Sequence, residues 1–233
     1  MLIGGIQTLT MLDFPGKIAA TIFTAGCNFR CGYCHNPELV LPELIKKNRH
    51  DLIPEEKFFN FLNTRKGLLD GVAISGGEPT VQLDLVSFIQ KIKNQGFLVK
   101  LDTNGGNPNV VEDLIKQNLV DYFAMDIKYP LEIYDKMTNV DISQERFEKS
   151  IELIRNAGVD YEFRTTVIAE FHDEAKIEQI LRKIQGCKKY TLQNFRPEIT
   201  LDQQFARFHG VTEEKMAKFR DLAKNYVEEV RVI

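Results

Sequence analysis

Six short apolar segments alternate with six segments of helical periodicity along this 233-residue chain. The apolar segments are rich in β-branched and aromatic residues, which favours strands at residues 18–25, 71–75, 97–101, 120–125, 161–168 and 189–195. Elsewhere apolar residues recur three or four positions apart, which predicts helices at residues 54–62, 83–95, 108–117, 144–156, 173–184 and 212–224. Connections of this length are too long for hairpins, so the pattern predicts an α/β fold with a parallel sheet. Periodicity alone does not distinguish an open doubly wound sheet from a barrel.

The chain is long and apolar enough for one α/β domain. Hydrophobic residues make up 43% of it, and we expect a single domain over residues 1–233 that ends in the helix at 212–224 and a closing strand at 227–233. The formal net charge of −3 gives no basic field of the kind that binds nucleic acid. The first residues show no signal-peptide pattern, and no apolar run approaches the roughly 18 residues of a membrane span. We therefore expect a cytoplasmic protein without a membrane or nucleic-acid partner.

Three of the four cysteines lie in a loop at residues 26–36, directly after the first apolar segment. Cys27, Cys31 and Cys34 have the spacing C-x3-C-x2-C. This loop follows the carboxyl end of a predicted strand, where α/β folds usually carry their chemistry. Three thiolates cannot complete a four-cysteine zinc site, and the chain has no second C-x2-C pair. The spacing suits a [4Fe–4S] cubane in which one iron has no protein ligand and can hold a small chelating molecule.

Two other interpretations of the three thiols are open. One is a structural zinc loop with His35 as the fourth ligand, although adjacent ligands at Cys34 and His35 make that geometry awkward. The other is a set of unrelated buried thiols. Clustered thiols in a chain without an export signal favour a metal site in a reducing cytoplasm over disulfides. Cys187, far downstream, is interpreted as a structural thiol.

Polar residues follow the second, third and fourth apolar segments where each segment ends. Their sequences are Gly76-Gly77-Glu78-Pro79, Asp102-Thr103-Asn104-Gly105 and Asp126-Ile127-Lys128. Glycines let the backbone approach a ligand, carboxylates accept from ammonium groups or bind hard cations, and an ammonium complements a carboxylate. Taken singly, these motifs also fit an ordinary glycine turn and solvated rim charges. Arg164 is a lone charge in the fifth apolar segment, either for a ligand or for a structural ion pair.

Together, the cysteine loop and the Gly-Gly-Glu-Pro motif resemble the signatures of the radical S-adenosylmethionine (SAM) superfamily. The resemblance implies a partial (β/α)6 barrel. It also implies that the open iron of the [4Fe–4S] cluster binds the amino and carboxylate groups of SAM, and that the reduced cluster cleaves SAM to methionine and a 5′-deoxyadenosyl radical. In this superfamily the Gly-Gly-Glu-Pro motif contacts the methionyl amino group, which assigns Gly76, Gly77, Glu78 and Pro79 to SAM binding.

The two later strand-end motifs resemble those of the glycyl-radical-enzyme activases, typified by the pyruvate formate-lyase activating enzyme. The resemblance implies a possible monovalent-cation site beside SAM at Asp102, Thr103 and Asp126. Asn104 belongs to the same motif and is assigned to the cofactor site with them.

The same resemblance assigns four further residues. Lys128 is expected to contact the SAM carboxylate, and Arg164 to contact SAM or the substrate peptide. Tyr33 matches the aromatic residue that lies near adenine, and His35 completes the C-x-x-C-H-N sequence of the activases. The catalytic set implied by the resemblance therefore comprises the three cluster cysteines with Lys128 and Arg164.

The pattern over residues 5–7, 13–17 and 34–39 is most similar to the anaerobic ribonucleoside-triphosphate reductase activating proteins. The implied function is an oxidoreductase that takes a hydrogen from a glycine of a separate glycyl radical enzyme under anaerobic conditions. Anaerobic ribonucleotide reductase is the expected partner, and a protein such as flavodoxin or ferredoxin is the expected electron donor.

The sequence departs from the activases in two places. It has no extra cysteines for ferredoxin-like clusters, so we expect a single cluster. At residues 192–197 it has no histidine of the kind that the formate-lyase activase directs at SAM, and the replacing residue stays undetermined. Two alternatives are open: a radical SAM enzyme acting on a small molecule, similar to 7-carboxy-7-deazaguanine synthase, and a zinc-stabilised structural module.

Overall fold

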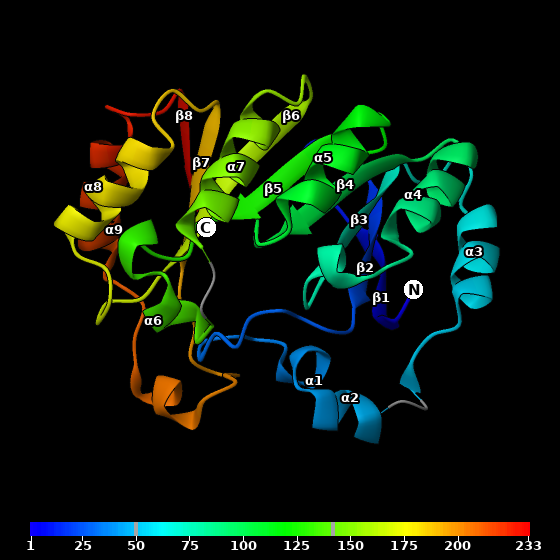
Figure 1. The fold of residues 1–233 in the computed structure, drawn as a ribbon, viewed down its shortest axis with the longest axis horizontal. Helices are drawn as coiled ribbons and strands as arrows, with labels where there is room; N and C mark the ends of the chain where they lie inside the picture. The colour runs from blue at the N-terminus through cyan, green and yellow to red at the C-terminus, as the bar shows by residue number, and fades with distance from the viewer. Residues whose placement is uncertain (49–50, 141–142) are drawn as a thin grey trace.

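A computed structural model describes residues 1–48, 51–140 and 143–233, and its centre is one eight-stranded sheet with the strands in chain order. Strand β1 pairs antiparallel with β2, and every later neighbouring pair is parallel. The sheet is curved and does not close, since β1 and β8 are its two ends (Figure 1). The strands are β1 Ile3–Thr10, β2 Ala19–Thr24, β3 Gly71–Gly76, β4 Leu98–Thr103, β5 Tyr122–Asp126, β6 Asp160–Val167, β7 Lys189–Asn194 and β8 Glu229–Val232. The expected α/β partial barrel is confirmed.

The six expected helices are present within one or two residues of their predicted ends. Two of them begin with side-chain caps, at Asp173 and Thr212, which accept from the amides of Lys176 and Lys215. The helices lie along one face and the sides of the sheet (Figure 1). They are α3 Glu55–Asn63, α4 Leu85–Asn94, α5 Pro108–Lys116, α7 Gln144–Arg155, α8 Glu174–Lys183 and α9 Glu213–Ala223.

Three further short helices lie near the carboxyl ends of the strands: α1 Pro37–Val40, α2 Pro42–Lys47 and α6 Asp135–Thr138. The predicted helices leave the connection between the cysteine loop and residue 54 without a helix, and this is wrong as far as the structure describes that stretch. Both Pro37 and Pro42 are the first residues of helices, where a missing N–H costs nothing. Residues 49–50 of that connection lie outside the described residues.

Strand β1 is the second difference from the expected fold, because the sequence interpretation began the sheet at residue 18. Its burial does not alternate, and residues 7–9 are exposed whereas Thr10 is buried. The expected closing strand is present as β8, which is shorter than residues 227–233.

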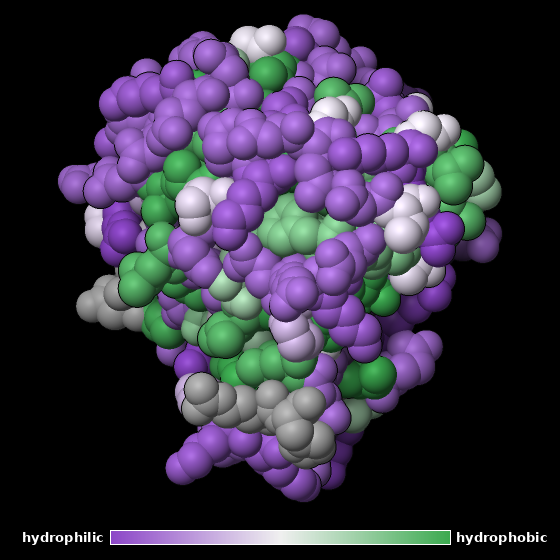
Figure 2. Space-filling view, turned by 90° about the vertical axis from the view of Figure 1, so that its right-hand side faces the viewer, coloured by the Kyte–Doolittle hydropathy of each residue, from purple (hydrophilic) through white to green (hydrophobic). Residues whose placement is uncertain are grey.

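One continuous core runs beneath the helices, from Ile3 in β1 to Val227 before β8. Figure 2, which looks onto the side that carries α3, shows a mostly hydrophilic surface with hydrophobic residues between the charged ones. Within the described residues, no helix combines the length and apolarity needed to span a bilayer. Because seven strands run parallel, their carboxyl ends meet at one rim, where the predicted motifs come together.

Candidate active site

The predicted site residues line a single pocket at the carboxyl rim of the sheet. Its volume is about 850 Å³, including solvent at its mouth. The three cysteines of the loop after β2 form one wall, and the motifs after β3, β4 and β5 form the others. The lining residues are Cys27, Phe29, Cys31, Tyr33, Cys34, His35, Asn36, Val40, Ser75, Gly76, Gly77, Glu78, Pro79, Asp102, Thr103, Asn104, Asp126, Lys128, Arg164 and Thr166.

Backbone contacts seat the cysteine loop on the Gly-Gly-Glu-Pro motif. The amide of Glu78 donates to the Gly26 carbonyl at 2.8 Å, and the amide of Gly77 donates to the Thr24 carbonyl at 2.8 Å. A β-carbon on Gly77 would lie 2.2 Å from the Gly26 oxygen, and one on Gly76 would lie 2.2 Å from the Thr24 nitrogen. Gly76 also has φ of +116°, which L-residues rarely adopt. The motif therefore needs both glycines for close backbone packing against the cysteine loop.

The three loop thiols fit a cluster better than a single metal ion. Burial and the Glu78 charge raise the pKa of Cys27 to about 12, and burial raises the pKa of Cys31 to about 11. Among the described residues, no three His, Cys, Asp or Glu side chains gather closely enough for one metal ion. Three thiols that line one pocket without converging on one point suit a cubane, whose ligands bind separate irons. Cys187 lies apart and is fully buried.

The Glu78 carboxylate joins the Gly-Gly-Glu-Pro motif to the loop after β4. It is 1% exposed and accepts from the hydroxyl of Thr103 at 2.7 Å and from the amide of Asn104 at 2.7 Å. It also accepts from the amide of Thr80 at 3.2 Å and from the Thr80 hydroxyl. The carboxylate therefore holds two strand-end loops together, and its hydrogen-bond partners among the described residues are protein donors.

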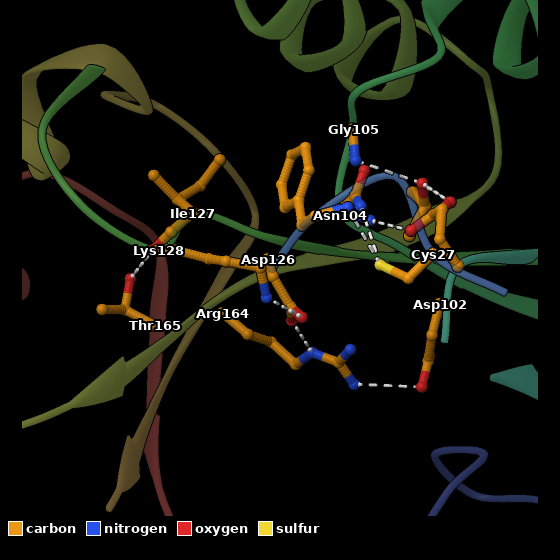
Figure 3. Close-up of polar contacts among 12 residues, drawn as sticks. Cys27, Asp102, Asn104, Gly105, Asp126, Ile127, Lys128, Arg164 and Thr165 are labelled. Atoms are coloured by element: carbon orange, nitrogen blue, oxygen red, sulfur yellow. Dashed lines mark hydrogen bonds and ion pairs between the residues drawn. The ribbon is translucent and has the colours of Figure 1, made fainter. Parts of the chain in front are cut away.

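Five alternating charges run from the barrel interior to the pocket. Lys100 Nζ pairs with Asp102 Oδ1, and Arg164 Nη1 lies 3.5 Å from Asp102 Oδ2. Arg164 Nε donates to Asp126 Oδ1 at 2.9 Å, and Lys128 Nζ lies 3.1 Å from Asp126 Oδ2. Figure 3 shows Arg164 between the two acids. The structural ion pair considered for Arg164 is thus present in a residue that also lines the pocket.

These pairs fix the ionisation of the acids and of Lys128. Although burial opposes charge, Lys128 and Arg164 hold the pKa of Asp126 at about 2. Arg164 and Lys100 likewise hold the pKa of Asp102 below its ordinary value against burial. Asp126 holds the pKa of Lys128 well above its ordinary value, so Lys128 presents a permanent positive charge to the pocket.

The segment after β7 packs against the cysteine loop. The His35 ring stacks on Phe195 at 5.8 Å, and its Nε2 contacts the Arg196 carbonyl at 2.8 Å. Tyr33 packs edge-on against Phe195, and Lys128 Nζ lies 5.8 Å from the Tyr33 ring centroid. The Tyr33 hydroxyl is buried with no hydrogen-bond partner among the described residues. In the part of the chain described, no residue of 192–197 lines the pocket, so the residue that replaces the activase histidine stays unassigned.

Two polar residues near the site were not identified from the sequence. Lys100 is 2% exposed and stands two positions before Asp102 on the same face of β4. His172 is buried and contacts the carbonyl of Lys128 at 3.3 Å. Lys100, like Arg164, is a lone charge in an apolar strand, and this feature could have identified it. His172 follows β6 with no motif around it.

Residues 21–184 match the radical SAM superfamily. The chain is 36% identical over 236 residues to a candidate glycyl-radical enzyme activating enzyme of Methanocaldococcus jannaschii, covering 98% of this chain and 94% of that protein. It is 27% identical over 248 residues to the pyruvate formate-lyase-activating enzyme of Clostridium pasteurianum, covering 97% and 98%.

Solved structures share the fold at low identity. Streptococcus suis SuiB has a TM-score of 0.67 at 13% identity, covering 91% of this chain and 48% of SuiB. Escherichia coli coproporphyrinogen III oxidase, described as a radical SAM enzyme, has a TM-score of 0.59 at 12% identity, covering 89% and 52%. This chain therefore spans about half the length of these two proteins.

The match over most of the chain defines the class: the protein belongs to the radical SAM superfamily. Within it, the long and well-covered similarity to activating enzymes identifies a radical SAM enzyme of the glycyl-radical-enzyme activase family. This family implies a [4Fe–4S] cluster, SAM and a glycyl radical enzyme as partner.

Proposed function

We propose that this chain activates a separate glycyl radical enzyme by removing a hydrogen atom from a backbone glycine, and that anaerobic ribonucleotide reductase is its first candidate partner. A pyruvate formate-lyase-type enzyme is the second candidate. The observation that carries the proposal is the rim pocket that gathers three thiols with the motifs at the ends of β3, β4 and β5 and with Arg164 of β6. The names of the two relatives that match over nearly their whole length support activation of an enzyme over modification of a metabolite.

The residues of the pocket have separate roles in this proposal. Cys27, Cys31 and Cys34 hold the cluster, which when bound supplies the electron that cleaves SAM to methionine and a 5′-deoxyadenosyl radical. Lys128 binds the SAM carboxylate, because its ammonium is permanently charged and reaches the pocket. Arg164 orients Lys128 through the shared Asp126 carboxylate.

Glu78 and Tyr33 complete the proposed SAM site. Glu78 fixes the backbone of Gly76 and Gly77 against the cysteine loop, since its four accepted hydrogen bonds hold the neighbouring loop in place. The buried Tyr33 hydroxyl, which lacks a partner among the described residues, is a donor for the adenosine moiety. A low-potential protein such as flavodoxin or ferredoxin serves as electron donor.

The test is transfer of the radical between proteins. Anaerobically reconstituted protein is mixed with SAM, dithionite and each candidate partner, and the glycyl doublet is sought by EPR. With the partner glycine deuterated, deuterium is expected in 5′-deoxyadenosine. A Cys27→Ala/Cys31→Ala/Cys34→Ala variant should give neither signal. A Lys128→Met variant should keep its cluster but bind SAM at least about tenfold more weakly.

Two outcomes would contradict the proposal. If SAM is consumed, neither partner acquires the doublet and a small molecule is modified instead, the enzyme acts on a metabolite. If anaerobic preparation yields stoichiometric zinc and no iron, the three cysteines form a structural site.

A further inference from the structure

The strand-end acids that the sequence assigned to a monovalent cation already have protein cations on every carboxylate oxygen. Asp102 Oδ1 is paired with Lys100, and Asp102 Oδ2 faces Arg164. Asp126 Oδ1 accepts from Arg164, and Asp126 Oδ2 faces Lys128. A metal ion at these oxygens would share each carboxylate with an ammonium or guanidinium group, and the positive charge of that group would oppose it.

Thr103, the third residue expected to bind the cation, also has protein hydrogen-bond partners. The Thr103 hydroxyl donates to Glu78 at 2.7 Å and accepts from the amide of Gly105 at 3.1 Å. The proton of this hydroxyl and one of its two lone pairs are therefore engaged by protein groups.

Lys100 is the member of this network that faces the barrel interior. It is 2% exposed, its ammonium pairs with Asp102, and the Tyr122 ring centroid lies 6.0 Å away. A buried ammonium is stable only when paired, and a buried carboxylate has the same requirement. Lys100 and Arg164 together place two positive groups on the Asp102 carboxylate, where a hard cation would otherwise be needed.

The geometry points to Lys100 as a built-in counter-ion that, with Arg164, replaces the monovalent metal cation beside SAM, so that SAM binding by this chain does not depend on Na⁺ or K⁺. Lys100 is then a positioning residue. It neutralises Asp102, which leaves Arg164 free to bridge both acids and Lys128 free to face the pocket. The inference rests on the proposed use of this pocket for SAM but not on the identity of the partner enzyme.

The first arm of the test uses the cluster-free protein and no SAM. Its melting temperature is measured in KCl, NaCl and tetramethylammonium chloride at equal ionic strength, since tetramethylammonium is too large and too weakly coordinating to replace a metal ion. The wild type is expected to melt within about 1 °C in all three salts. Lys100→Met should melt lower in tetramethylammonium and be stabilised saturably by K⁺ or Na⁺, because a bound cation stabilises the folded state.

The second arm measures SAM binding to the cluster-loaded protein by calorimetry. Wild-type affinity should be equal in the three salts, whereas Lys100→Met should bind at least about tenfold more weakly in tetramethylammonium and recover in K⁺. Lys100→Arg, which keeps the charge, should behave as the wild type. Lys93→Met is the matched control, since it removes a Lys–Asp pair at Asp121 that does not line the pocket.

Three results would overturn the inference. The first is a wild type whose melting temperature or SAM affinity depends on K⁺ or Na⁺. The second is a folded Lys100→Met or Lys100→Gln variant whose melting temperature and SAM affinity are the same in all three salts, and the third is that both variants fail to fold in every salt. The last result counts against it because a metal ion should be able to supply the missing charge. A variant that folds in K⁺ and not in tetramethylammonium supports it. If the wild type does not bind SAM at all, the proposed function fails, while the melting arm still decides the role of Lys100.

Discussion

The imidazole of His172 contacts the pocket-lining residue Lys128 but does not line the pocket itself. It is 1% exposed, and its Nδ1 accepts from the amide of Ile168 at 3.1 Å. Because Nδ1 accepts, Nε2 carries the proton and donates to the Lys128 carbonyl at 3.3 Å. A neutral ring therefore ties the loop after β6 to the loop that carries Lys128, and burial lowers the pKa of His172 to about 4.

This pKa predicts a pH-dependent loss of stability. The unfolded imidazole has a pKa near its ordinary 6.5, so between about pH 6.5 and pH 4 the unfolded chain binds a proton that the folded chain does not. The stabilisation is complete above pH 6.5 and is lost as pH falls to about 4, by about 3 kcal/mol at most.

The measurement is urea unfolding of the wild type and His172→Gln from pH 4 to pH 8. The difference in free energy of unfolding between them should shrink by about 2–3 kcal/mol on acidification. A constant difference across this range would show that His172 is not held neutral.

The site residues that could be predicted from the sequence are those that belong to motifs and those whose charge interrupts an apolar strand. A charge is rare in an apolar strand, which marks Arg164 in β6 and equally marks Lys100 in β4. The partners of Glu78 could not be predicted, since Thr103 and Asn104 reach it only through the packing of two neighbouring strands.

Among the elements, long periodic helices were predictable and short segments at the rim were not. Helices α1 and α2 are too short for periodicity to show, although each begins with a proline, which is common at the first helical position. Strand β1 has two adjacent glycines and a partly exposed surface, so it lacks both the alternation and the apolar run of a typical strand.

The turn at η4 (Gln203–Arg207) packs against the cysteine loop through one aromatic ring. A β-carbon on Gly32 would lie 2.2 Å from Phe205, whose ring stacks on Phe171 at 5.6 Å. The amide of Asp202 also donates to the Gly32 carbonyl at 2.9 Å. A glycine at position 32 is thus required for the segment after β7 to pack against the cysteine loop.

This contact predicts coupling between two substitutions. Gly32→Ala should cost about 1–3 kcal/mol by overpacking against Phe205. In Gly32→Ala/Phe205→Ala the added methyl group meets no ring, so the double variant should lose at least about 1 kcal/mol less than the sum of the single losses. Urea unfolding measures all three. Gly5→Ala, whose β-carbon would make only an ordinary 3.6 Å contact, should be additive with Phe205→Ala. Additivity for Gly32 as well would contradict the packing.

For the whole molecule, the strand order followed from the family resemblance, because a (β/α) barrel places each strand beside the preceding one, whereas periodicity alone left a doubly wound sheet open. The direction of β1 and the extent of closure did not follow from either, because β1 pairs antiparallel with β2 after a short connection and the sheet stays open between β1 and β8. The resulting sheet has two unlike ends: β8 is largely exposed and pairs only with β7, and β1 pairs with β2 and, at Ile3, with Ile53.

The open sheet predicts uneven stability across the barrel. Strands β3 and β5 are buried and paired on both sides, so their amides should exchange only by global or near-global unfolding. Amides in β8 and in the exposed residues 7–9 of β1 can open by losing one neighbour, so they should exchange at least about 100-fold faster. Hydrogen exchange followed by mass spectrometry at peptide resolution measures this. Equal protection in β8 and β5 would mean that something covers the free edge in solution. With the expected difference in protection, the most stable part of the barrel would lie next to Glu78, Asp102 and Asp126, where the site needs fixed geometry. The parts that open most readily would be the two ends of the sheet.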